Sequence, residues 1–238
     1  MANVFITGVS RDLGLGIALV KQYLAQGDTV YAASRRVDGD HIKELQAQYA
    51  DKLIVVEMDV CDLESVKAAA EVIKEKTGTL DLLISNATAS NKDGNKAIDD
   101  GMDTEHMFNA YNVNAIGFLR VVQTFLPLVK SGSVLAAITS EQGSMGKCWR
   151  DLGMDYGAAK AALNYCCVVL QRRLMHQGLR VLAIHPGWVQ THPAPPKANL
   201  TPEESAAYIA NTIKNPPPFN EDGNTGVYLN YDGAHFPF

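Results

Sequence analysis

The N-terminal stretch that decides the fold of this chain reads Val4-Phe5-Ile6-Thr7-Gly8-Val9-Ser10-Arg11-Asp12-Leu13-Gly14. An apolar run leads into a glycine-bearing turn, and the turn opens an amphipathic segment whose apolar positions are Ile17, Leu19, Val20 and Leu24. This order predicts a β-strand, a tight turn and a helix. Because backbone N–H groups at a helix N-terminus bind phosphate well, the stretch predicts a site for the pyrophosphate of a dinucleotide.

The alternation of strand and helix patterns continues along the chain. Apolar runs predict strands at Val4–Thr7, Thr29–Ser34, Ile54–Met58, Leu80–Ser85, Val134–Thr139, Arg180–His185 and Val227–Asn230. Helical patterns lie near residues 13–26, 39–50, 62–77, 104–130, 156–177 and 202–214. The first strands are continuous apolar runs, which is typical of parallel strands buried on both faces. We therefore expect an α/β fold, with residues 1–238 forming a single domain on a Rossmann-type, doubly wound parallel sheet that has helices on both faces.

Composition narrows the class of protein. Nearly half of the 238 residues are hydrophobic and the net charge is −5, which favours a large core and argues against a nucleic-acid-binding surface. No apolar stretch approaches the length of a membrane span, and the first strand begins too early to leave room for a signal peptide. The four cysteines form no CxxC pair, and the adjacent Cys166 and Cys167 are most simply core thiols. We expect a cytoplasmic protein that binds no membrane, nucleic acid or metal.

Two further motifs fall at the ends of predicted elements. Tyr156 and Lys160 lie four residues apart, hence on one face of a helix. A cation beside a phenol lowers the pKa of the phenol, which suits a tyrosine that acts as an acid near neutral pH. Ser140 ends the fifth strand and is a better candidate than Thr139 or Ser144 to hydrogen-bond a substrate carbonyl. The alternatives are a surface tyrosine–lysine pair and an ordinary turn at Ser140.

Taken in this order, the motifs resemble those of the short-chain dehydrogenase/reductase family, and the resemblance runs almost end to end. Thr7, Gly8 and Gly14 match the family's TGxxxGxG pattern. The resemblance implies a cofactor site that also includes Ser10, Arg11, Asp12 and Leu13 of the turn, the pair Asp59-Val60 beside the adenine, and the pair Asn86-Ala87 after the fourth strand, where the family has Asn-Asn-Ala-Gly. Asn86 has an alternative role, which is to stabilise its loop by bonding neighbouring backbone.

Asn114 is similar to the family's active-site asparagine, which kinks its helix and holds a water of the proton relay. Its alternative is a surface position on the helix. Pro186-Gly187-Trp188-Val189-Gln190-Thr191 matches the family's PGxxxT, which implies that the backbone at Val189 and the hydroxyl of Thr191 hold the nicotinamide carboxamide, next to Pro186 and Gly187. This motif, Leu200-Thr201-Pro202-Glu203-Glu204-Ser205-Ala206 and Asn230-Tyr231-Asp232-Gly233 resemble the carbonyl-reductase-like branch related to C-factor and sniffer.

The end of the second strand, Ala33-Ser34-Arg35-Arg36, bears on the choice of cofactor. An acidic residue there would bond the ribose hydroxyls of NAD and repel a 2′-phosphate. Ser34 stands in that place, Arg35 follows as a phosphate donor, and Arg11 is similar to a basic residue of NADPH-preferring members. We predict NADP, with NADPH preferred over NADH. The alternative is a pair of solvated surface arginines.

Asp12 departs from the glycine pattern and has two explanations. Aspartate caps helices well, and Asp12 stands about where the first helix is expected to start. A carboxylate there would also lie near the pyrophosphate and weaken cofactor binding unless Arg11 neutralises it.

The resemblance implies hydride transfer between NADPH and a ketone or aldehyde, with a small-molecule carbonyl or alcohol as substrate. Tyr156 would donate the proton, Ser140 would stabilise the oxyanion, and Lys160 with an Asn114-held water would resupply the proton, Lys160 also bonding the nicotinamide ribose. A substrate wall of Trp149, Leu152 and Trp188, with Ser140 and Tyr156, suggests an apolar or aromatic carbonyl. Arg150 and Lys147 could instead meet an anionic group. The short stretch His192–Leu200 suggests an open site.

Two alternatives to an enzyme stay open at this point: an NADP-binding sensor of the C-factor type with little turnover, and a structural protein. We also expect a homodimer or homotetramer. Helical stretches 104–130 and 156–177 carry apolar residues beyond one face, namely Phe118, Val121, Phe125, Leu163, Cys167 and Leu170. Deeper packing within the monomer is the alternative explanation for them.

Overall fold

The computed structural model describes residues 1–89, 96–191, 198–220 and 224–238. Its seven strands form one parallel sheet in the order β3-β2-β1-β4-β5-β6-β7. The strands are β1 (Asn3–Thr7), β2 (Thr29–Ser34), β3 (Leu53–Glu57), β4 (Leu80–Ser85), β5 (Val129–Ile138), β6 (Arg180–His185) and β7 (Tyr228–Asn230). The predicted doubly wound parallel sheet is confirmed, and every predicted strand is present.

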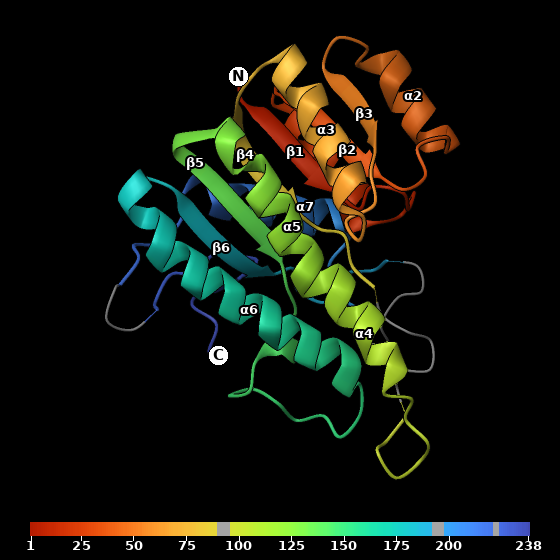
Figure 1. Ribbon diagram of the computed structural model, residues 1–238, viewed down its shortest axis with the longest axis vertical. Helices are drawn as coiled ribbons and strands as arrows, with labels where there is room; N and C mark the ends of the chain where they lie inside the picture. The colour runs from red at the N-terminus through yellow and green to blue at the C-terminus, as the bar shows by residue number, and fades with distance from the viewer. Residues whose placement is uncertain (90–95, 192–197, 221–223) are drawn as a thin grey trace.

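Helices cover both faces of the sheet (Figure 1). One face carries α1 (Leu15–Ala25), α2 (Asp40–Gln48) and α7 (Pro202–Lys214). The face toward the viewer carries α3 (Leu63–Lys76), α5 (Gly117–Phe125) and α6 (Met154–Leu174), and α4 (Glu105–Tyr111) continues the line of α5. Because both faces are buried, the strands need apolar side chains on both sides, which explains their continuous apolar runs.

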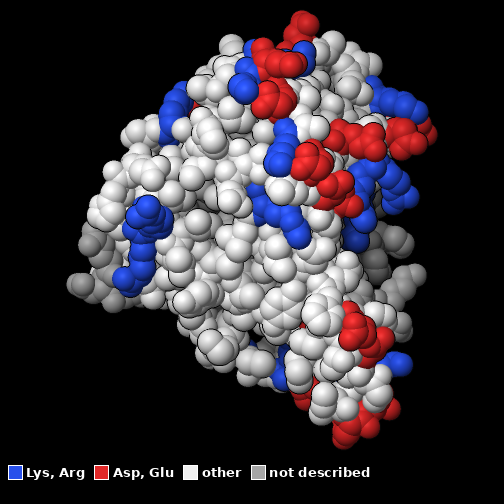
Figure 2. Space-filling view, viewed as in Figure 1, with Lys and Arg blue, Asp and Glu red and all other residues white. Residues whose placement is uncertain are grey.

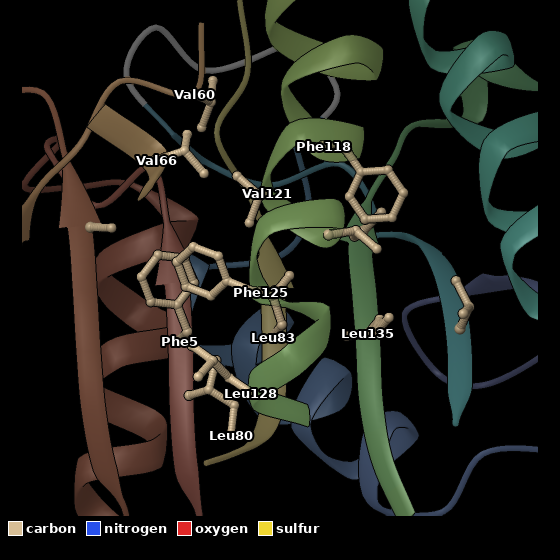
Figure 3. Packing of buried hydrophobic residues seen from close by; sticks show 14 of the residues in the cluster. Phe5, Val60, Val66, Leu80, Leu83, Phe118, Val121, Phe125, Leu128 and Leu135 are labelled. Atoms are coloured by element: carbon tan, nitrogen blue, oxygen red, sulfur yellow. The ribbon is translucent and has the colours of Figure 1, made fainter. Parts of the chain in front are cut away.

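The core on the viewer's side is built where α5 crosses the centre of the sheet. Phe5 of β1 and Phe125 of α5 are both fully buried, and their ring centroids lie 4.5 Å apart (Figure 3). The neighbours of Phe5 in β1, Val4 and Ile6, belong to the core on the other face with α1. This alternation fixes β1 between two cores, so the turn that follows it is held in place.

The sheet reverses its order between β1 and β4. The chain runs outward from β1 through β2 to β3 and then crosses back to pair β4 with the other side of β1. A reversal of this kind leaves a crevice outside the carboxyl ends of the strands, where ligands of such sheets bind.

The predicted helix over 104–130 is wrong as a single element. The structure has α4, a π-helical turn at Asn112–Ile116, α5 and a 3₁₀ turn at Leu126–Leu128, and β5 begins already at Val129. Pro127 lacks an N–H and cannot continue the helix, so the helix ends there. In the π turn the N–H of Gly117 bonds the carbonyl of Asn112, five residues earlier.

The apolar residues that suggested an oligomer have a different explanation. Of the six, five are buried inside the monomer, and only Leu170 is partly exposed: Phe118, Val121, Phe125, Leu163 and Cys167 lie in the core. The expectation that they form an exposed stripe is therefore wrong, because α5 and α6 pack these side chains against the sheet. In the described residues no helix is both long and apolar enough to cross a membrane.

Candidate active site

The glycine-bearing turn lies at the switch point, against the end of β4. The hydroxyl oxygen of Thr7 accepts hydrogen bonds from the backbone N–H groups of Asn86 and Ala87, at 3.1 and 3.0 Å. Gly8 adopts φ +77°, and a Cβ on it would stand 2.7 Å from the Cα of Ala87. Only glycine suits both the left-handed backbone and this close approach.

The first amides of α1 have no side-chain partner. Gly14 is the N-cap residue, and no side chain caps the helix. The idea that Asp12 caps α1 is therefore wrong, because the helix begins two residues later than that idea requires. Ser10 is half-buried, and Arg11, Asp12 and Leu13 are exposed at this terminus. Uncapped N–H groups at a helix N-terminus suit an anion such as a pyrophosphate.

Ser34 and Arg35 lie at the end of β2, beside the turn. Ser34 is buried, and its hydroxyl donates to the carbonyl of Arg36 at 2.9 Å and accepts from the N–H of Arg36 at 3.2 Å. Arg35 is exposed. Ser34 takes the last position of β2, where a carboxylate would repel a phosphate, and its register partner in β3 is the exposed Glu57.

The side chains of Asn86 and Asp59 both hydrogen-bond to nearby backbone groups. The amide of Asn86 donates to the carbonyls of Thr7 and Gly8, each at 3.0 Å. Asp59 accepts from the N–H of Cys61 at 2.9 Å, and the buried Val60 accepts from Arg120 through its carbonyl. The stabilising role expected as the alternative for Asn86 is thus present, and it joins the turn to β4.

Ser140 and Tyr156 come together from β5 and α6. Tyr156 is the third residue of α6, and the hydroxyls of Ser140 and Thr88 are near enough to its phenol to influence its pKa. The Ser140 oxygen accepts from the N–H of Gln142 at 3.2 Å. This bond leaves the hydroxyl proton of Ser140 available to an acceptor in the site.

Lys160 lies one turn further along α6 and is buried. Its Nζ donates to the carbonyl of Ile138 at 2.8 Å and stands 5.5 Å from the centroid of the Tyr156 ring. Burial lowers the pKa of Lys160 from 10.5 to about 7. Burial raises the pKa of Tyr156, and the nearby hydroxyls of Thr88 and Ser140 oppose that rise. The influence that lowers the pKa of Tyr156 thus comes from two neutral hydroxyls. The sequence had suggested that the charge of Lys160 lowers it.

Asn114 is buried inside the π turn. Its Nδ2 donates to the carbonyls of Ala110 and Ala89, both at 2.8 Å, and its Oδ1 accepts from the hydroxyl of Thr88 at 2.7 Å. In the π turn the side-chain amide of Asn114 thus bonds the carbonyl of Ala110, which lies four residues earlier in the chain. A surface position for Asn114 is excluded, and the predicted distortion of the helix is present.

The predicted cofactor and substrate residues after β6 and β5 border the same sheet edge. Gly187 has φ +81°, Val189 is buried and bridges to Leu200, and Pro186 and Thr191 are half-buried. Trp149 and Leu152 are exposed and Trp188 is half-buried. Of the stretch His192–Leu200, residues 192–197 lie outside the described part of the chain.

Arg150 is not a free cation at this edge. Its guanidinium donates to Glu141 Oε1 at 2.6 Å and stacks 4.4 Å from the centroid of the Trp149 ring. Glu141 follows Ser140 directly and is mostly buried. The ion pair therefore neutralises the positive charge of Arg150, which the sequence had suggested as a partner for an anionic substrate.

Four supporting residues were missed from the sequence: Thr88, Asn164, His185 and Tyr228. Tyr228 of β7 donates to the carbonyl of Ser140 at 2.7 Å, and Asn164 accepts from Thr139. The N–H of Glu141 donates to His185 Nδ1 at 3.2 Å. Only Thr88 gave a signal, because it stands where the family pattern has glycine.

The ends of all six strands from β1 to β6 thus contribute residues to one edge of the sheet. This edge carries an uncapped helix N-terminus, which suits a phosphate, and the pair of Tyr156 and Ser140. This arrangement defines a dinucleotide-binding α/β oxidoreductase. A family model described as short chain dehydrogenase matches residues 2–199. The chain is 31% identical to an uncharacterized oxidoreductase of Schizosaccharomyces pombe, over 98% of this chain and 97% of the relative.

Solved structures agree. The NADPH-bound carbonyl reductase from chicken fatty liver superposes with a TM-score of 0.86 at 28% identity, covering 100% of this chain and 99% of that one. The carbonyl reductase Sniffer of D. melanogaster superposes with a TM-score of 0.89 over the whole of both chains, and at 23% identity it supports the fold alone. The chain belongs to the short-chain dehydrogenase family, in its carbonyl-reductase-like branch.

His185 generates a prediction about stability against pH. Burial lowers its pKa from 6.5 to about 4. Below about pH 6.5 the unfolded chain binds a proton at this histidine and the folded chain does not, so stability falls as the pH drops toward 4. The loss is on the order of 2–3 kcal/mol for this group.

His185→Asn keeps an acceptor for the N–H of Glu141 and does not titrate. We expect the variant to lose less unfolding free energy than wild type between about pH 7.5 and about pH 4.5, measured by urea denaturation. Equal losses in both proteins would show that His185 does not cause the acid sensitivity.

Proposed function

We propose that this chain is an NADP(H)-dependent carbonyl reductase that transfers hydride between NADPH and a ketone or aldehyde. The observation that carries the proposal is the tyrosine–serine pair, Tyr156 with Ser140, at the strand edge that also holds the uncapped N-terminus of α1. The likeness to an NADPH-bound carbonyl reductase over the full chain supports it.

The residues present fit a dinucleotide phosphate. The unpaired amides at the start of α1 suit the pyrophosphate, and the exposed Leu13 offers an apolar contact beside it. Arg35 and Arg11 are exposed, and β2 ends in Ser34 rather than in an acidic residue, which favours NADP over NAD. Backbone at Val189 and the hydroxyl of Thr191 would hold the carboxamide.

When bound, the dinucleotide supplies the hydride that the carbonyl carbon accepts. Tyr156 gives its proton to the carbonyl oxygen, and the free hydroxyl proton of Ser140 stabilises the developing negative charge there. Lys160, whose pKa of about 7 lets it exchange a proton near neutral pH, resupplies Tyr156. A water of the relay would meet Asn114 at its oxygen, because both amide hydrogens are already bonded.

The substrate side of the site favours an apolar or aromatic carbonyl compound. Trp149 and Leu152 are exposed apolar side chains on the segment between Ser140 and Tyr156, and Trp188 is half-buried after β6. Arg150 is neutralised by Glu141, which leaves the exposed Lys147 as the cation on this segment that could meet an anionic group. A sensor without turnover is the weaker alternative, because binding alone needs no tyrosine proton donor.

Tyr156→Phe tests the reaction directly. The phenyl ring keeps the packing and lacks the proton, so we expect NADPH-dependent reduction of aromatic ketones and aldehydes to fall roughly 10²–10⁴-fold. NADPH affinity, measured by fluorescence titration, should stay close to wild type. An active wild type with an equally active variant would refute the acid role. A wild type that binds NADPH but reduces no member of the carbonyl panel would favour the sensor.

Arg35→Asp tests the cofactor preference. It removes a phosphate donor and installs a carboxylate able to bond ribose hydroxyls, so the kcat/KM ratio of NADPH to NADH should fall about tenfold or more. Arg173→Asp makes the same charge change on the exposed end of α6 and serves as the control. An unchanged ratio in Arg35→Asp would contradict the NADP assignment.

We also propose a dimer, or a tetramer, paired through α5 and α6, which relatives often use as an interface. Exposed apolar side chains lie on these helices: Ile116 and Leu119 at the start of α5, Tyr165 and Val169 on α6. Few charged side chains cover the middle of α5 and α6 in Figure 2. Light scattering should give at least twice the monomer mass, and Val169→Asp should reduce it. A wild-type monomer at micromolar concentration would contradict the proposal.

A further inference from the structure

The peptide group that joins Ser140 to Glu141 is held by side chains at both of its ends. Its carbonyl oxygen accepts from the phenol of Tyr228 at 2.7 Å, and its N–H donates to His185 Nδ1 at 3.2 Å. Tyr228 lies in β7 and His185 ends β6, and both side chains are buried. The peptide therefore cannot rotate without breaking at least one of these two bonds.

Both side chains keep these hydrogen-bonding roles at neutral pH. Burial raises the pKa of Tyr228, so its phenol keeps the proton that it donates. Burial lowers the pKa of His185 to about 4, so its ring is neutral. Because Nδ1 of that ring accepts, its one proton lies on Nε2. Neither bond therefore depends on a group that changes its charge near pH 7.

The orientation of this peptide affects the position of the Ser140 hydroxyl. Ser140 is extended, with φ −157° and ψ 153°, and the chain then enters the short 3₁₀ turn Glu141–Gly143. The N–H of Gln142 in this turn donates to Ser140 Oγ at 3.2 Å. A rotation of the peptide changes ψ of Ser140 and carries the N–H of Gln142 away from Oγ. Tyr228 and His185 thus act on the hydroxyl through the backbone.

Phe236 packs against both of the side chains that hold the peptide. The centroid of its ring lies 5.1 Å from that of Tyr228 and 5.4 Å from that of His185. The chain turns back on itself after β7, and the N–H of Phe236 donates to the carbonyl of Tyr228 at 2.9 Å. This packing restricts both rings to the directions in which they meet the peptide.

We propose that Tyr228 is a positioning residue that, together with His185, fixes the Ser140–Glu141 peptide and so places the Ser140 hydroxyl for its bond to the substrate oxygen. This inference rests on the proposed function. Tyr228 and His185 exchange no proton with the substrate. A hydroxyl stabilises a developing oxyanion well only at about 2.7–3.1 Å, so a small displacement of Ser140 weakens this stabilisation.

Tyr228→Phe tests the proposal, because it removes the phenol oxygen and keeps the ring. The carbonyl of Ser140 still accepts from the N–H of Gly143 at 3.0 Å, so the variant leaves it with a partner. We expect kcat and kcat/KM for carbonyl reduction to fall together, about three- to tenfold, since the lost stabilisation belongs to the transition state. NADPH affinity, measured by fluorescence titration, should stay at the wild-type value.

Ser140→Ala separates positioning from a general structural defect. If Tyr228 acts through the Ser140 hydroxyl, adding Tyr228→Phe to Ser140→Ala should not lower the residual kcat further. Tyr31→Phe is the matched control. Tyr31 is also fully buried in a strand, and its phenol is hydrogen-bonded to Thr77 at 2.9 Å rather than to the Ser140 turn. The control should leave kcat at the wild-type value.

An unchanged kcat in Tyr228→Phe would overturn the inference. An equal loss with and without the Ser140 hydroxyl would also overturn it, because independent defects multiply. Should Tyr228→Phe fail to fold, Phe236→Leu takes its place, since it loosens the packing on both side chains that hold the peptide. Its loss of kcat must then disappear in the Ser140→Ala chain.

If the wild type reduces no carbonyl and oxidises no alcohol, the proposed function fails instead. The inference is then judged by amide hydrogen exchange, measured by NMR, at the N–H of Glu141. This group must exchange about tenfold faster in Tyr228→Phe than in Tyr31→Phe, because its peptide has lost one of its two side-chain partners. Equal exchange in the two variants would show that Tyr228 does not hold the peptide.

Discussion

The structure depends on the contact between the turn after β1 and the end of β4. Thr7 accepts from two backbone N–H groups of the β4 end, and Asn86 donates back to Thr7 and Gly8. The contact is close enough that a Cβ on Gly16 would stand 2.7 Å from Nδ2 of Asn86. These hydrogen bonds place the uncapped start of α1 beside the end of β4. The position of the candidate phosphate site is therefore set by this junction.

Much of the fold could be predicted because a strand that is buried on both faces needs apolar residues at successive positions. Val4, Phe5 and Ile6 are all apolar since alternate side chains enter different cores. The stretch 104–130 was predicted as one helix because a π turn and an α-helix bury nearly the same positions, and periodicity cannot separate them. Val129 at the start of β5 follows a proline-ended helix without any polar boundary, so no residue there marks the change of element.

The positions of Ser140, Tyr156 and Lys160 could be predicted because chain order and strand ends place them at one edge of the sheet. His185 and Tyr228 were missed because their roles exist only after folding: each acts on the backbone of the 140–141 turn from a strand far along the chain. Asp12 shows the opposite failure. A residue type that favours caps was assigned to a cap, yet α1 begins at Leu15 with Gly14 before it. The carboxylate therefore lies exposed before the N-terminus of α1 and caps nothing there.

Burial also changes which groups can set the pKa of Tyr156. In water a nearby ammonium would be the simplest way to lower the pKa of a phenol. Inside this site the same burial that raises the pKa of Tyr156 lowers that of Lys160 to about 7, so the lysine carries only part of a positive charge near neutral pH. A neutral hydroxyl loses far less on desolvation than a charged group does. It can also accept from the phenol and donate to the phenolate, which an ammonium cannot. In the proposed reaction Tyr156 passes between both forms in each turnover, and a neutral neighbour such as Ser140 suits both forms better than a charge does.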